Sequence, residues 1–325
     1  MNVTYIIGNG FDLNLGLETG YQAFYDYYIK VPSPNSQVKL LKDSIEQDGY
    51  ELWSDLEIGL GKISAKYEKV EDFIAALTDI SDHLRKYIAN TNKEVKIKLY
   101  DTERFRRDLC NPGKYLVEAD RIFLSAFCKR TVNSWNVNIL SFNYTDTIYR
   151  LLGNANSKSG TQIGVNEFNS AVTVGPVQYV HGRYDDTILV GVNDNEQIRK
   201  TEFRNHIDLE DMFVKPQANN AIGKLTDDTC HAFINASQLI CIFGHSMGET
   251  DKIWWERIKE NLTTRDCRLI IFVYNDKINI KHQRFRRLTI KRRLMAELGW
   301  TDSIASKVYI GLNTDIFNLK RNSLG

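Results

Sequence analysis

The sequence has almost no excess of charge of either sign, since 42 lysines and arginines face 41 aspartates and glutamates among 325 residues. A protein without a strong overall field has no general attraction for nucleic acid or for an anionic membrane. The sequence also lacks an apolar run approaching the roughly 20 residues that span a bilayer. Its N-terminus lacks the basic segment and long apolar stretch of a signal peptide. These absences predict a cytoplasmic protein with no membrane partner.

Cysteine is scarce in the sequence, and no two cysteines form a Cys-x-x-Cys pair. The five are Cys110, Cys128, Cys230, Cys241 and Cys267. An odd, scattered set is typical of reduced thiols and argues against a structural zinc site. Four histidines have no mutual spacing suited to a metal ion, namely His83, His206, His231 and His282. The sequence therefore predicts no metal cofactor.

The most informative segment lies at the N-terminus, where an apolar run over residues 3–7 ends at Gly8. Gly10 follows after one residue, and an amphipathic helical pattern begins near Leu13. A strand that enters a helix through Gly-x-Gly presents backbone N–H groups to a phosphate, and glycine allows close approach of the ligand. The third glycine, Gly16, comes six residues after the second rather than three, so this is not the ordinary dinucleotide fingerprint. A tight turn is the alternative interpretation.

The same loop carries polar and acidic side chains. Asn9 and Asp12 interrupt it, and Phe11 lies between them. A carboxylate repels phosphate, so we expect Asp12 to face a ribose hydroxyl or the reacting end of a ligand.

The next hundred residues are helical in pattern. A Pro-x-Pro break at Pro32 and Pro34 opens this region. Its clearest helix has apolar residues three and four apart, as one buried face requires: Val70, Phe73, Ile74, Leu77, Ile80, Leu84, Tyr87 and Ile88. We predict that residues 31–132 form a helical insertion packing over the site, and that residues 1–30 and 133–325 form the nucleotide-binding α/β domain.

Strand signals return after the insertion, as continuous apolar runs of the kind found in parallel strands covered on both faces. With the first run, the predicted strands are 3–7, 137–142, 178–180, 188–192, 239–243, 269–274 and 308–310. Helical patterns separate several of them, at residues 146–152, 221–236, 250–261 and 279–298. This alternation predicts a doubly wound, Rossmann-like, mostly parallel sheet. The segment 153–170 is rich in Asn, Ser and Gly and is predicted to be a mobile loop.

Polar motifs follow five of the predicted strands, at the point where each ends. They are Gly8-Asn9-Gly10, Asn143-Tyr144-Thr145-Asp146, His181-Gly182, Gly244-His245-Ser246 and Asn275-Asp276. Ligands of doubly wound proteins bind outside the carboxyl ends of the strands. We therefore expect these five motifs to converge on one crevice.

The order of these motifs resembles that of the sirtuin superfamily. Gly8-Asn9-Gly10-Phe11-Asp12 with Gly16 has the glycine spacing of the sirtuin Gly-Ala-Gly loop, and Ser141-Phe142-Asn143-Tyr144-Thr145-Asp146 is similar to Thr-Gln-Asn-x-Asp. His181-Gly182 resembles the catalytic His-Gly, Gly244-His245-Ser246-Met247 resembles Gly-Thr-Ser-Leu, and Val273-Tyr274-Asn275 resembles a late strand ending in Asn. The whole chain is still more similar to the AbiH family of bacterial abortive-infection proteins, through the opening motif, Phe-Asn-Tyr-Thr, His-Gly, Gly-His-Ser and Trp53-Ser54-Asp55-Leu56-Glu57.

The resemblance implies an NAD+ glycohydrolase that cleaves the nicotinamide–ribose bond and depletes NAD+ during antiphage defence. NAD+ is then substrate rather than resident cofactor. The implied catalytic residues are Asn143, which positions water and ribose, His181 as general base, and Asp12. The implied NAD-binding residues are Gly8, Asn9, Gly10, Phe11, Asp146, Gly244, His245, Ser246 and Asn275. Protein deacylation fits poorly, because the chain cannot build the sirtuin four-cysteine module and has Phe142 in place of the motif's Gln.

Each of these residues also has a structural interpretation. Asn143 is a suitable helix cap. His181 precedes a glycine, and the alternative is that it only closes a turn. The alternative for His245 is a buried imidazole with its hydrogen bonds satisfied. Glu57 lies four residues after Trp53, a spacing that on a helix points both side chains into the cleft. The alternative is that Trp53 packs in the core and Glu57 is a surface carboxylate.

Two functions compete with NAD+ cleavage. One is a module that senses NAD+, ADP-ribose or another nucleotide without turnover. The other is a nucleic-acid-acting effector using residues 277–293, which hold eight Lys or Arg and no acid. Apolar residues in that segment suggest instead that one face packs on the domain, namely Ile280, Phe285, Leu288 and Leu294. A phage-derived trigger and a homo-oligomer, a dimer by default, complete the expected partners.

Overall fold

The computed structural model describes residues 1–49, 53–130, 134–156, 160–223, 225–278 and 283–320. A sheet with the order β3-β4-β2-β1-β6-β7-β8 forms its centre, and β5 also pairs with β2. The strands are β1 Asn2–Ile7, β2 Trp135–Ser141, β3 Thr161–Val165, β4 Ala171–Val174, β5 Gln178–Tyr179, β6 Leu239–Phe243, β7 Arg268–Val273 and β8 Val308–Leu312. All of these pair in parallel except β3, which runs antiparallel to β4. The predicted mostly parallel α/β class is confirmed.

The first strand lies in the middle of the sheet. From β1 the chain builds outward through β2 on one side, and then returns to add β6 on the other side of β1. The direction of building therefore reverses at β1. In open α/β sheets this reversal marks the place where ligands bind, beyond the carboxyl ends of the strands.

Helices cover both faces of the sheet and also form a separate lobe. Their bounds are α1 Gly10–Asn14, α2 Tyr21–Tyr28, α3 Ser36–Asp48, α4 Leu56–Ile63, α5 Val70–Lys93, α6 Thr102–Cys110, α7 Glu118–Cys128, α8 Thr147–Leu152, α9 Ile207–Phe213, α10 Lys215–Ala221, α11 Thr226–Ala236, α12 Lys252–Thr264 and α13 Gln283–Glu297. Side chains alternate along β1, so Tyr5 and Ile7 join the core under α6, α7 and α8. Ile6 joins the opposite core, under α11, α12 and α13.

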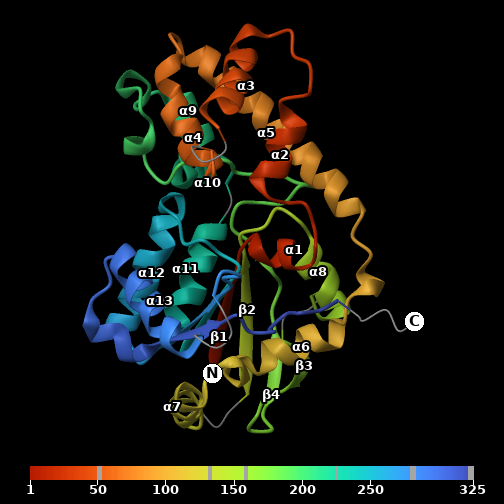
Figure 1. The fold of residues 1–325 in the computed structure, drawn as a ribbon, viewed down its shortest axis with the longest axis vertical. Coiled ribbons are helices and arrows are strands. Elements are labelled where there is room, and N and C mark those ends of the chain that lie inside the picture. The colour runs from red at the N-terminus through yellow and green to blue at the C-terminus, as the bar shows by residue number, and fades with distance from the viewer. Residues whose placement is uncertain (50–52, 131–133, 157–159, 224, 279–282, 321–325) are drawn as a thin grey trace.

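The helical lobe has a core of its own. Apolar faces of α2, α3, α4 and α5 pack there with α9 and with Val190 and Val192. The 24-residue α5 buries Phe73, Leu77 and Ile80 in this core, as its predicted spacing requires. Figure 1 shows this lobe above the carboxyl end of β1, with α9 and α10 beside α4. The lobe thus combines residues before 95 with residues after 190, whereas α6 and α7 pack on the sheet.

Several predicted elements differ from the structure. Residues 188–192 form no regular strand, only isolated bridges from Gly182 to Ile188 and from Val192 to Val214, because here the chain leaves the sheet for the helical lobe. Residues 161–165 of the predicted mobile loop form β3, an edge strand paired with β4. Both strands of this hairpin are short and half-exposed, and so they lack the continuous apolar run that identified the others.

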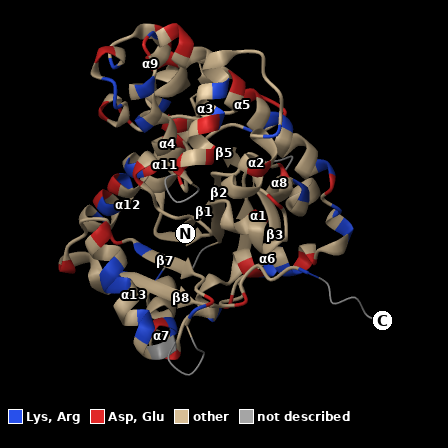
Figure 2. Ribbon diagram, turned by 45° about the horizontal axis from the view of Figure 1, so that its top comes forward, with Lys and Arg blue, Asp and Glu red and all other residues tan. Residues whose placement is uncertain are grey.

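Of the predicted helix over 221–236, residues 226–236 form α11, whereas Ala221 is the last residue of the separate helix α10; Gly223, whose φ is +66°, lies between the two. The last predicted helix is confirmed from residue 283 as α13, and residues 279–282 lie outside the described part of the chain. Figure 2 shows that acidic and basic residues are spread along the ribbon of both the helical lobe and the sheet domain.

Candidate active site

The loops after β1 and β6 cross in backbone-to-backbone contact. A Cβ on Gly10 would lie 2.6 Å from the Cα of Gly244, and one on Gly8 would lie 2.7 Å from the Gly244 carbonyl oxygen. Gly244 itself has a φ of +66°, in the left-handed region that favours glycine. Glycine is therefore required at these positions because it allows two strand-end loops to touch, a role that could not be predicted from the sequence.

The crossing uses the N–H groups that were expected to face a phosphate. Gly8 donates to the carbonyl of Phe243 at 2.9 Å, and Gly10 donates to the carbonyl of Gly244 at 2.7 Å. The helix that follows, α1, has only five residues. The loop consequently offers fewer free donors than its sequence suggested.

Two further residues of the motif hold the loop together. The side-chain oxygen of Asn9 accepts from the Thr19 hydroxyl at 2.6 Å, and its amide nitrogen donates to the Thr19 carbonyl at 3.1 Å. Phe11 is fully buried among Phe105, Phe243 and Phe317. Both side chains thus face the protein.

Asp12 is a carboxylate buried without a cation. It is fully inaccessible, its Oδ2 accepts from the Thr145 hydroxyl at 2.7 Å, and its Oδ1 has no partner among the described residues. Burial raises the pKa of Asp12 to about 7, against the opposing effect of the hydroxyls and amide around it. The group therefore changes charge near neutral pH.

Asn143 lies beside this carboxylate and helps to lower its pKa. The residue is 3% exposed, and neither polar atom of its side chain has a hydrogen-bond partner within the described structure. Buried amides nearly always have partners, so an open one is unusual. The nearby Thr147 hydroxyl is buried and unpartnered as well. Asp12, Asn143, Thr145 and Thr147 form what we call the Asp12 cluster.

His181 lies close by in the backbone, because β5 pairs with β2. Ser141 is opposite Tyr179, so Asn143 and His181 each come two residues after a paired position. The two loops are also linked by the N–H of Tyr184, which donates to the Tyr144 carbonyl at 2.9 Å. The structure therefore brings these two predicted catalytic residues to the end of the same strand pair.

The imidazole of His181 is held by Asp251. Its Nε2 lies 3.0 Å from Oδ1 of Asp251, and the histidine is 6% exposed. An ionised carboxylate only accepts, so Nε2 carries the proton, while Nδ1 has no partner among the described residues and is left as a base. Burial and the positive charge of Lys215 lower the pKa of His181, which keeps the ring neutral.

Lys215 and Glu57 extend this group into the helical lobe. The Lys215 Nζ lies 2.9 Å from Oδ1 of Asp251 and 2.8 Å from Oε2 of Glu57, and it also donates to the Thr250 carbonyl. The other carboxylate oxygen of Glu57 accepts from the N–H of Gly191 at 3.2 Å. All these side chains are at least 89% buried. We call Glu57, His181, Lys215, His245 and Asp251 the junction network, because α4 and α10 meet the sheet domain there.

His245 completes the junction network in a defined tautomer. Its Nδ1 accepts from the N–H of Met247 at 2.9 Å, so its Nε2 carries the proton and faces Oδ2 of Asp251 at 3.4 Å. The ring of Phe142 stands edge-on to both imidazoles, with centroids 5.1 Å from His181 and 4.6 Å from His245. Aromatic packing thus fixes the two rings.

The charges of the junction network nearly balance. The Lys215 ammonium holds the pKa of Asp251 well below its usual range, although burial opposes this. Its two carboxylate neighbours raise the pKa of Lys215 in spite of burial. Burial raises the pKa of Glu57 to about 7, and Lys215 opposes that rise. The ammonium of Lys215 therefore faces one carboxylate that stays ionised, Asp251, and a second, Glu57, that titrates near neutral pH.

Glu57 corrects a sequence-based interpretation. Trp53 precedes α4 rather than lying on it, because α4 begins at Leu56 with Asp55 as N-cap. The indole packs against Gly59, where a Cβ would lie 2.5 Å from its ring. Glu57 is nevertheless 5% exposed, so its carboxylate belongs to the interior and not to the surface.

Three other predicted binding residues lie in different surroundings. Asp146 accepts from the Asn92 amide of α5 at 2.9 Å and pairs with Arg150. Asn275 joins the loops after β7 and β8, because its N–H donates to the side-chain oxygen of Asn313 at 2.7 Å. Ser246 is exposed in the loop after β6. The first two hold loops in place, and the third is accessible.

Two residues of the junction network were missed in the sequence. Asp251 stands at the N-cap of α12 but makes no cap hydrogen bond, because its carboxylate points to His181 and Lys215 instead. Lys215 begins α10 before Pro216 and gives no sign in the sequence of being buried. An acidic residue at a predicted helix start was the available signal, and it reads equally as a simple cap.

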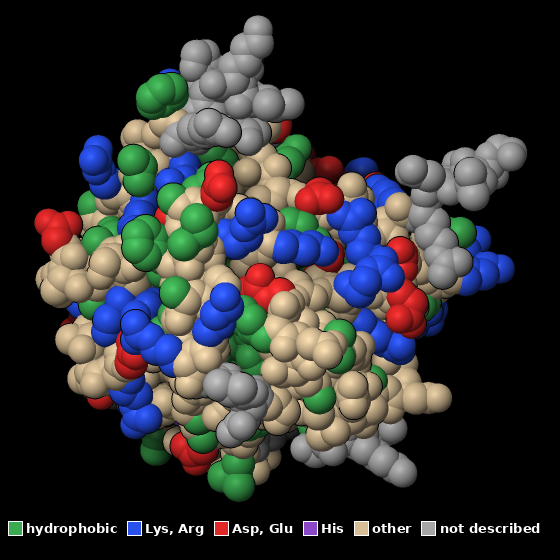
Figure 3. Space-filling view, turned by 90° about the horizontal axis from the view of Figure 1, so that it is seen from below, with side chains coloured by type: hydrophobic (Ala, Val, Ile, Leu, Met, Phe, Trp, Pro, Cys, Tyr) green, Lys and Arg blue, Asp and Glu red, His purple; other side chains and the backbone are tan. Residues whose placement is uncertain are grey.

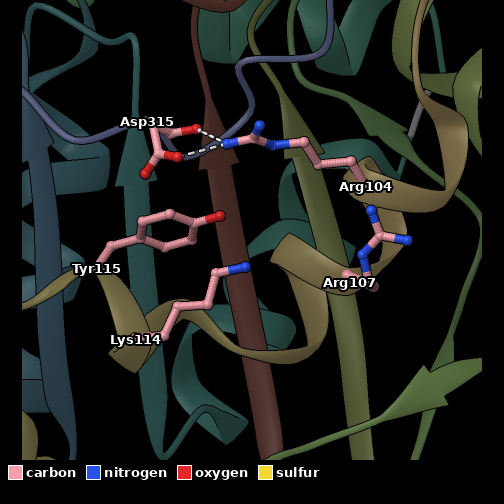
Figure 4. A pocket seen from close by; sticks show the side chains of 5 residues that line it. All are labelled: Arg104, Arg107, Lys114, Tyr115 and Asp315. Atoms are coloured by element: carbon pink, nitrogen blue, oxygen red, sulfur yellow. Dashed lines mark hydrogen bonds and ion pairs between the residues drawn. The ribbon is translucent and has the colours of Figure 1, made fainter. Parts of the chain in front are cut away.

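A surface hollow of about 470 Å³ lies apart from both groups, lined by Arg104, Arg107, Lys114, Tyr115 and Asp315 (Figure 4). Its cations already have carboxylate partners. Arg104 pairs with Asp315 at 2.7 Å, Arg107 with Asp101, and Lys114 with the buried Asp108. The hollow is therefore close to neutral, and none of its lining residues belongs to the predicted site.

All five cysteines are free and buried. Among the residues that the structure describes, no group of three or more His, Cys, Asp or Glu is arranged to hold a metal ion. Within the same ranges, no helix has the length and apolarity needed to cross a membrane.

Comparison with known proteins supports one assignment. No curated protein matches the sequence. The model of one family, described as bacteriophage abortive infection AbiH, matches residues 4–273. That range takes in the glycine crossing, the Asp12 cluster and the whole junction network, and it covers most of the chain. The chain therefore belongs to the AbiH family of bacteriophage abortive infection.

Proposed function

We propose that this protein hydrolyses the bond between nicotinamide and ribose in NAD+, and that loss of NAD+ is its part in abortive infection. The observation that carries the proposal is the buried amide of Asn143, which acts on the buried carboxylate of Asp12 and has no partner at ordinary hydrogen-bond distance among the described residues. An open buried amide is suited to a polar ligand, and ribose hydroxyls both donate and accept. The order of strand-end motifs, which resembles that of sirtuins, suggests that the ribose belongs to NAD+.

The proposed chemistry uses the residues at the ends of β1, β2 and β5. The C1′–N bond breaks and its electron pair leaves with nicotinamide, which becomes neutral and needs no acid. Asp12 stabilises the positive charge that develops on the ribose, and the cationic ring of bound NAD+ favours its ionised form. Asn143 orients water towards C1′, and Nδ1 of His181 takes the proton as the new C–O bond forms. The products are nicotinamide, ADP-ribose and one proton.

The remaining residues have supporting roles in the proposal. Gly8, Gly10 and Gly244 shape the loop crossing beside the pyrophosphate, and the exposed Ser246 donates to a phosphate oxygen. Asn9, Phe11, His245 and Asn275 hold the surrounding loops, and Asp146 ties the loop after β2 to α5.

The test follows nicotinamide and ADP-ribose after NAD+ is added to the purified protein, and follows NAD+ levels in phage-infected cells that express it. Asn143→Ala and His181→Gln are expected to abolish the loss of NAD+. Asn90→Ala and His206→Gln, in the helical lobe, are matched controls that should leave it unchanged. NAD+ that persists in both settings while calorimetry shows it bound intact would identify a sensor and overturn the proposal.

A further inference from the structure

Asp251 stands at the N-cap of α12 but does not serve as a cap. Its side chain makes no hydrogen bond to the first turn of the helix, although aspartate is among the residues favoured there. The loss of a cap costs about 1 kcal/mol of helix stability. Such a departure from local preference marks a side chain whose direction is set by another interaction.

The carboxylate of Asp251 is held at both of its oxygens. Its Oδ1 lies 3.0 Å from Nε2 of His181 and 2.9 Å from Nζ of Lys215, and its Oδ2 lies 3.4 Å from Nε2 of His245. The two histidines belong to the sheet domain, whereas Lys215 begins α10 and also pairs with Glu57 of α4. The carboxylate is therefore fixed from the sheet domain and from the helical lobe at once.

Burial makes this arrangement stronger than the ion pairs of the surface. Figure 3 shows acidic and basic side chains spread over one exposed face of the molecule, where water and salt screen their charges. The side chains of Asp251 and Lys215 are instead only 11% and 8% exposed. Charges in such surroundings act on their neighbours with little screening. The ionised Asp251 therefore has a strong effect on the imidazole beside it.

We propose that Asp251 is a positioning residue for the general base His181, and that it acts by fixing the tautomer of the ring and by stabilising its protonated form. The inference rests on the proposed cleavage of NAD+. An ionised carboxylate only accepts hydrogen bonds, so Nε2 of His181 carries a proton and Nδ1 is the nitrogen that can take one. When Nδ1 takes the proton of the attacking water, the ring gains a positive charge beside the carboxylate, which stabilises it.

Lys215 and His245 support Asp251 in this role. Although burial opposes it, the Lys215 ammonium holds the pKa of Asp251 well below its usual range, so the carboxylate stays ionised. Burial and Lys215 also lower the pKa of His181, and Asp251 acts against them. His245 holds the second oxygen of the carboxylate. The ring of His181 is therefore neutral before the reaction, and Asp251 offsets the cost of charging it.

The alternative is an ion network that only joins the two lobes. A histidine in such a network is expected to have both ring nitrogens hydrogen-bonded. Nδ1 of His181 has no partner among the described residues, and only its Nε2 is held. An ion network of this kind also gives no reason for the base strength of the ring to follow the charge of Asp251. These two points favour the positioning role and define its test.

The first experiment is NMR of the ring nitrogens of His181 in the full chain without NAD+, assigned by the loss of their signals in His181→Gln. We expect the native ring to be the tautomer with its proton on Nε2. Asparagine accepts and donates hydrogen bonds, so Asp251→Asn should give a mixture of tautomers. It should also lower the pKa of His181, because the carboxylate that raises this pKa is gone.

The second experiment is the pH dependence of NAD+ cleavage. Asp251→Asn should lower kcat by about 10² to 10⁴ with little change in KM. It should also move the acidic limb of the kcat/KM profile to lower pH, because a base of lower pKa stays unprotonated there. Asp101→Asn is the matched control, since Asp101 is the N-cap of α6 and pairs with Arg107 at 3.5 Å. It should leave the ring, kcat and the pH profile unchanged.

The two experiments separate this inference from the proposed function. A native ring with its proton on Nδ1, or an Asp251→Asn variant with the native tautomer and the native kcat, would overturn the positioning role. The native spectrum needs no variant, so it can do so even if Asp251→Asn does not fold. If the tautomer depends on Asp251 as expected while NAD+ stays intact, the proposed function fails and the control of the ring by Asp251 stands.

Discussion

Replacing Asp12 with asparagine is expected to stabilise the protein and to abolish the proposed cleavage of NAD+. The carboxylate is fully buried, has no cation partner and accepts one hydrogen bond, from the Thr145 hydroxyl. Asparagine has nearly the same shape and can still accept that hydrogen bond. It removes the charge whose burial opposes folding.

The magnitude follows from the pKa of Asp12, which burial raises from 3.8 to about 7. Between these values the folded protein binds the proton more tightly than the unfolded chain does, so the stability contributed by this group falls as pH rises. Each pKa unit corresponds to about 1.4 kcal/mol. Above pH 7 burial of the ionised carboxylate therefore costs about 4 kcal/mol. At pH 5 the folded protein holds this group protonated while the unfolded chain is mostly ionised, and the cost is about 1 to 2 kcal/mol.

The assay is urea unfolding followed by tryptophan fluorescence at pH 8 and at pH 5. Asp12→Asn should raise the free energy of unfolding by up to about 4 kcal/mol at pH 8, with a clearly smaller gain at pH 5. Asp43→Asn, on the exposed side of α3, is the control for a general change of charge. An Asp12→Asn variant that is less stable at pH 8, or whose gain is the same at both pH values, would refute the reasoning.

Three further predictions concern the rest of the candidate site. Lys215→Met removes one partner of a buried pair and should lower the free energy of unfolding by about 3 to 5 kcal/mol. Adding Glu57→Gln should recover part of that stability, because it removes an unpaired buried charge. Lys215→Met should also raise the pKa of His181, measured by NMR titration of the ring, because the ammonium that lowers this pKa is gone. A non-glycine residue in the left-handed conformation costs about 1 to 3 kcal/mol. Gly223→Ala, at a φ of +66° with open space around it, should lose only this amount of stability, whereas Gly244→Ala, at the same φ but in contact with Gly10, should lose more. Equal losses would mean that the close contact at the loop crossing does not matter for stability. His181→Gln should lower kcat for NAD+ cleavage by about 10² to 10⁴ without a matching change in KM, and an unaltered kcat would remove His181 from the role of base.

Much of the sheet was predictable from the sequence, because strands buried on both faces appear as continuous apolar runs. The segments around Ile6, Leu140, Ile242 and Ile271 are of this kind, and each is a strand. The edge hairpin of β3 and β4 was missed because one side of it is open to solvent, so its sequence mixes polar and apolar residues.

The candidate site was predictable only in part. Strand-end motifs identified Asn143 and His181, because position at the carboxyl edge follows from topology. The partners of His181 could not be predicted from the sequence. Asp251 and Lys215 stand at the starts of α12 and α10, and the direction of their side chains depends on how the two lobes pack together. The orientation of α13 was likewise beyond the sequence, because Phe285 and Leu294 are both apolar and only packing decides which one is covered.

The two-part origin of the helical lobe has a consequence for synthesis in the cell. Its core needs Val190, Val192, Ile198 and Phe213, which follow the end of α5 by about 100 to 120 residues. At ordinary translation speeds the ribosome takes roughly 5 to 20 s to supply them. During that interval the apolar sides of α2 to α5 are exposed in the nascent chain. They are then accessible to chaperones, and slow codons between α5 and Phe213 would prolong the exposure.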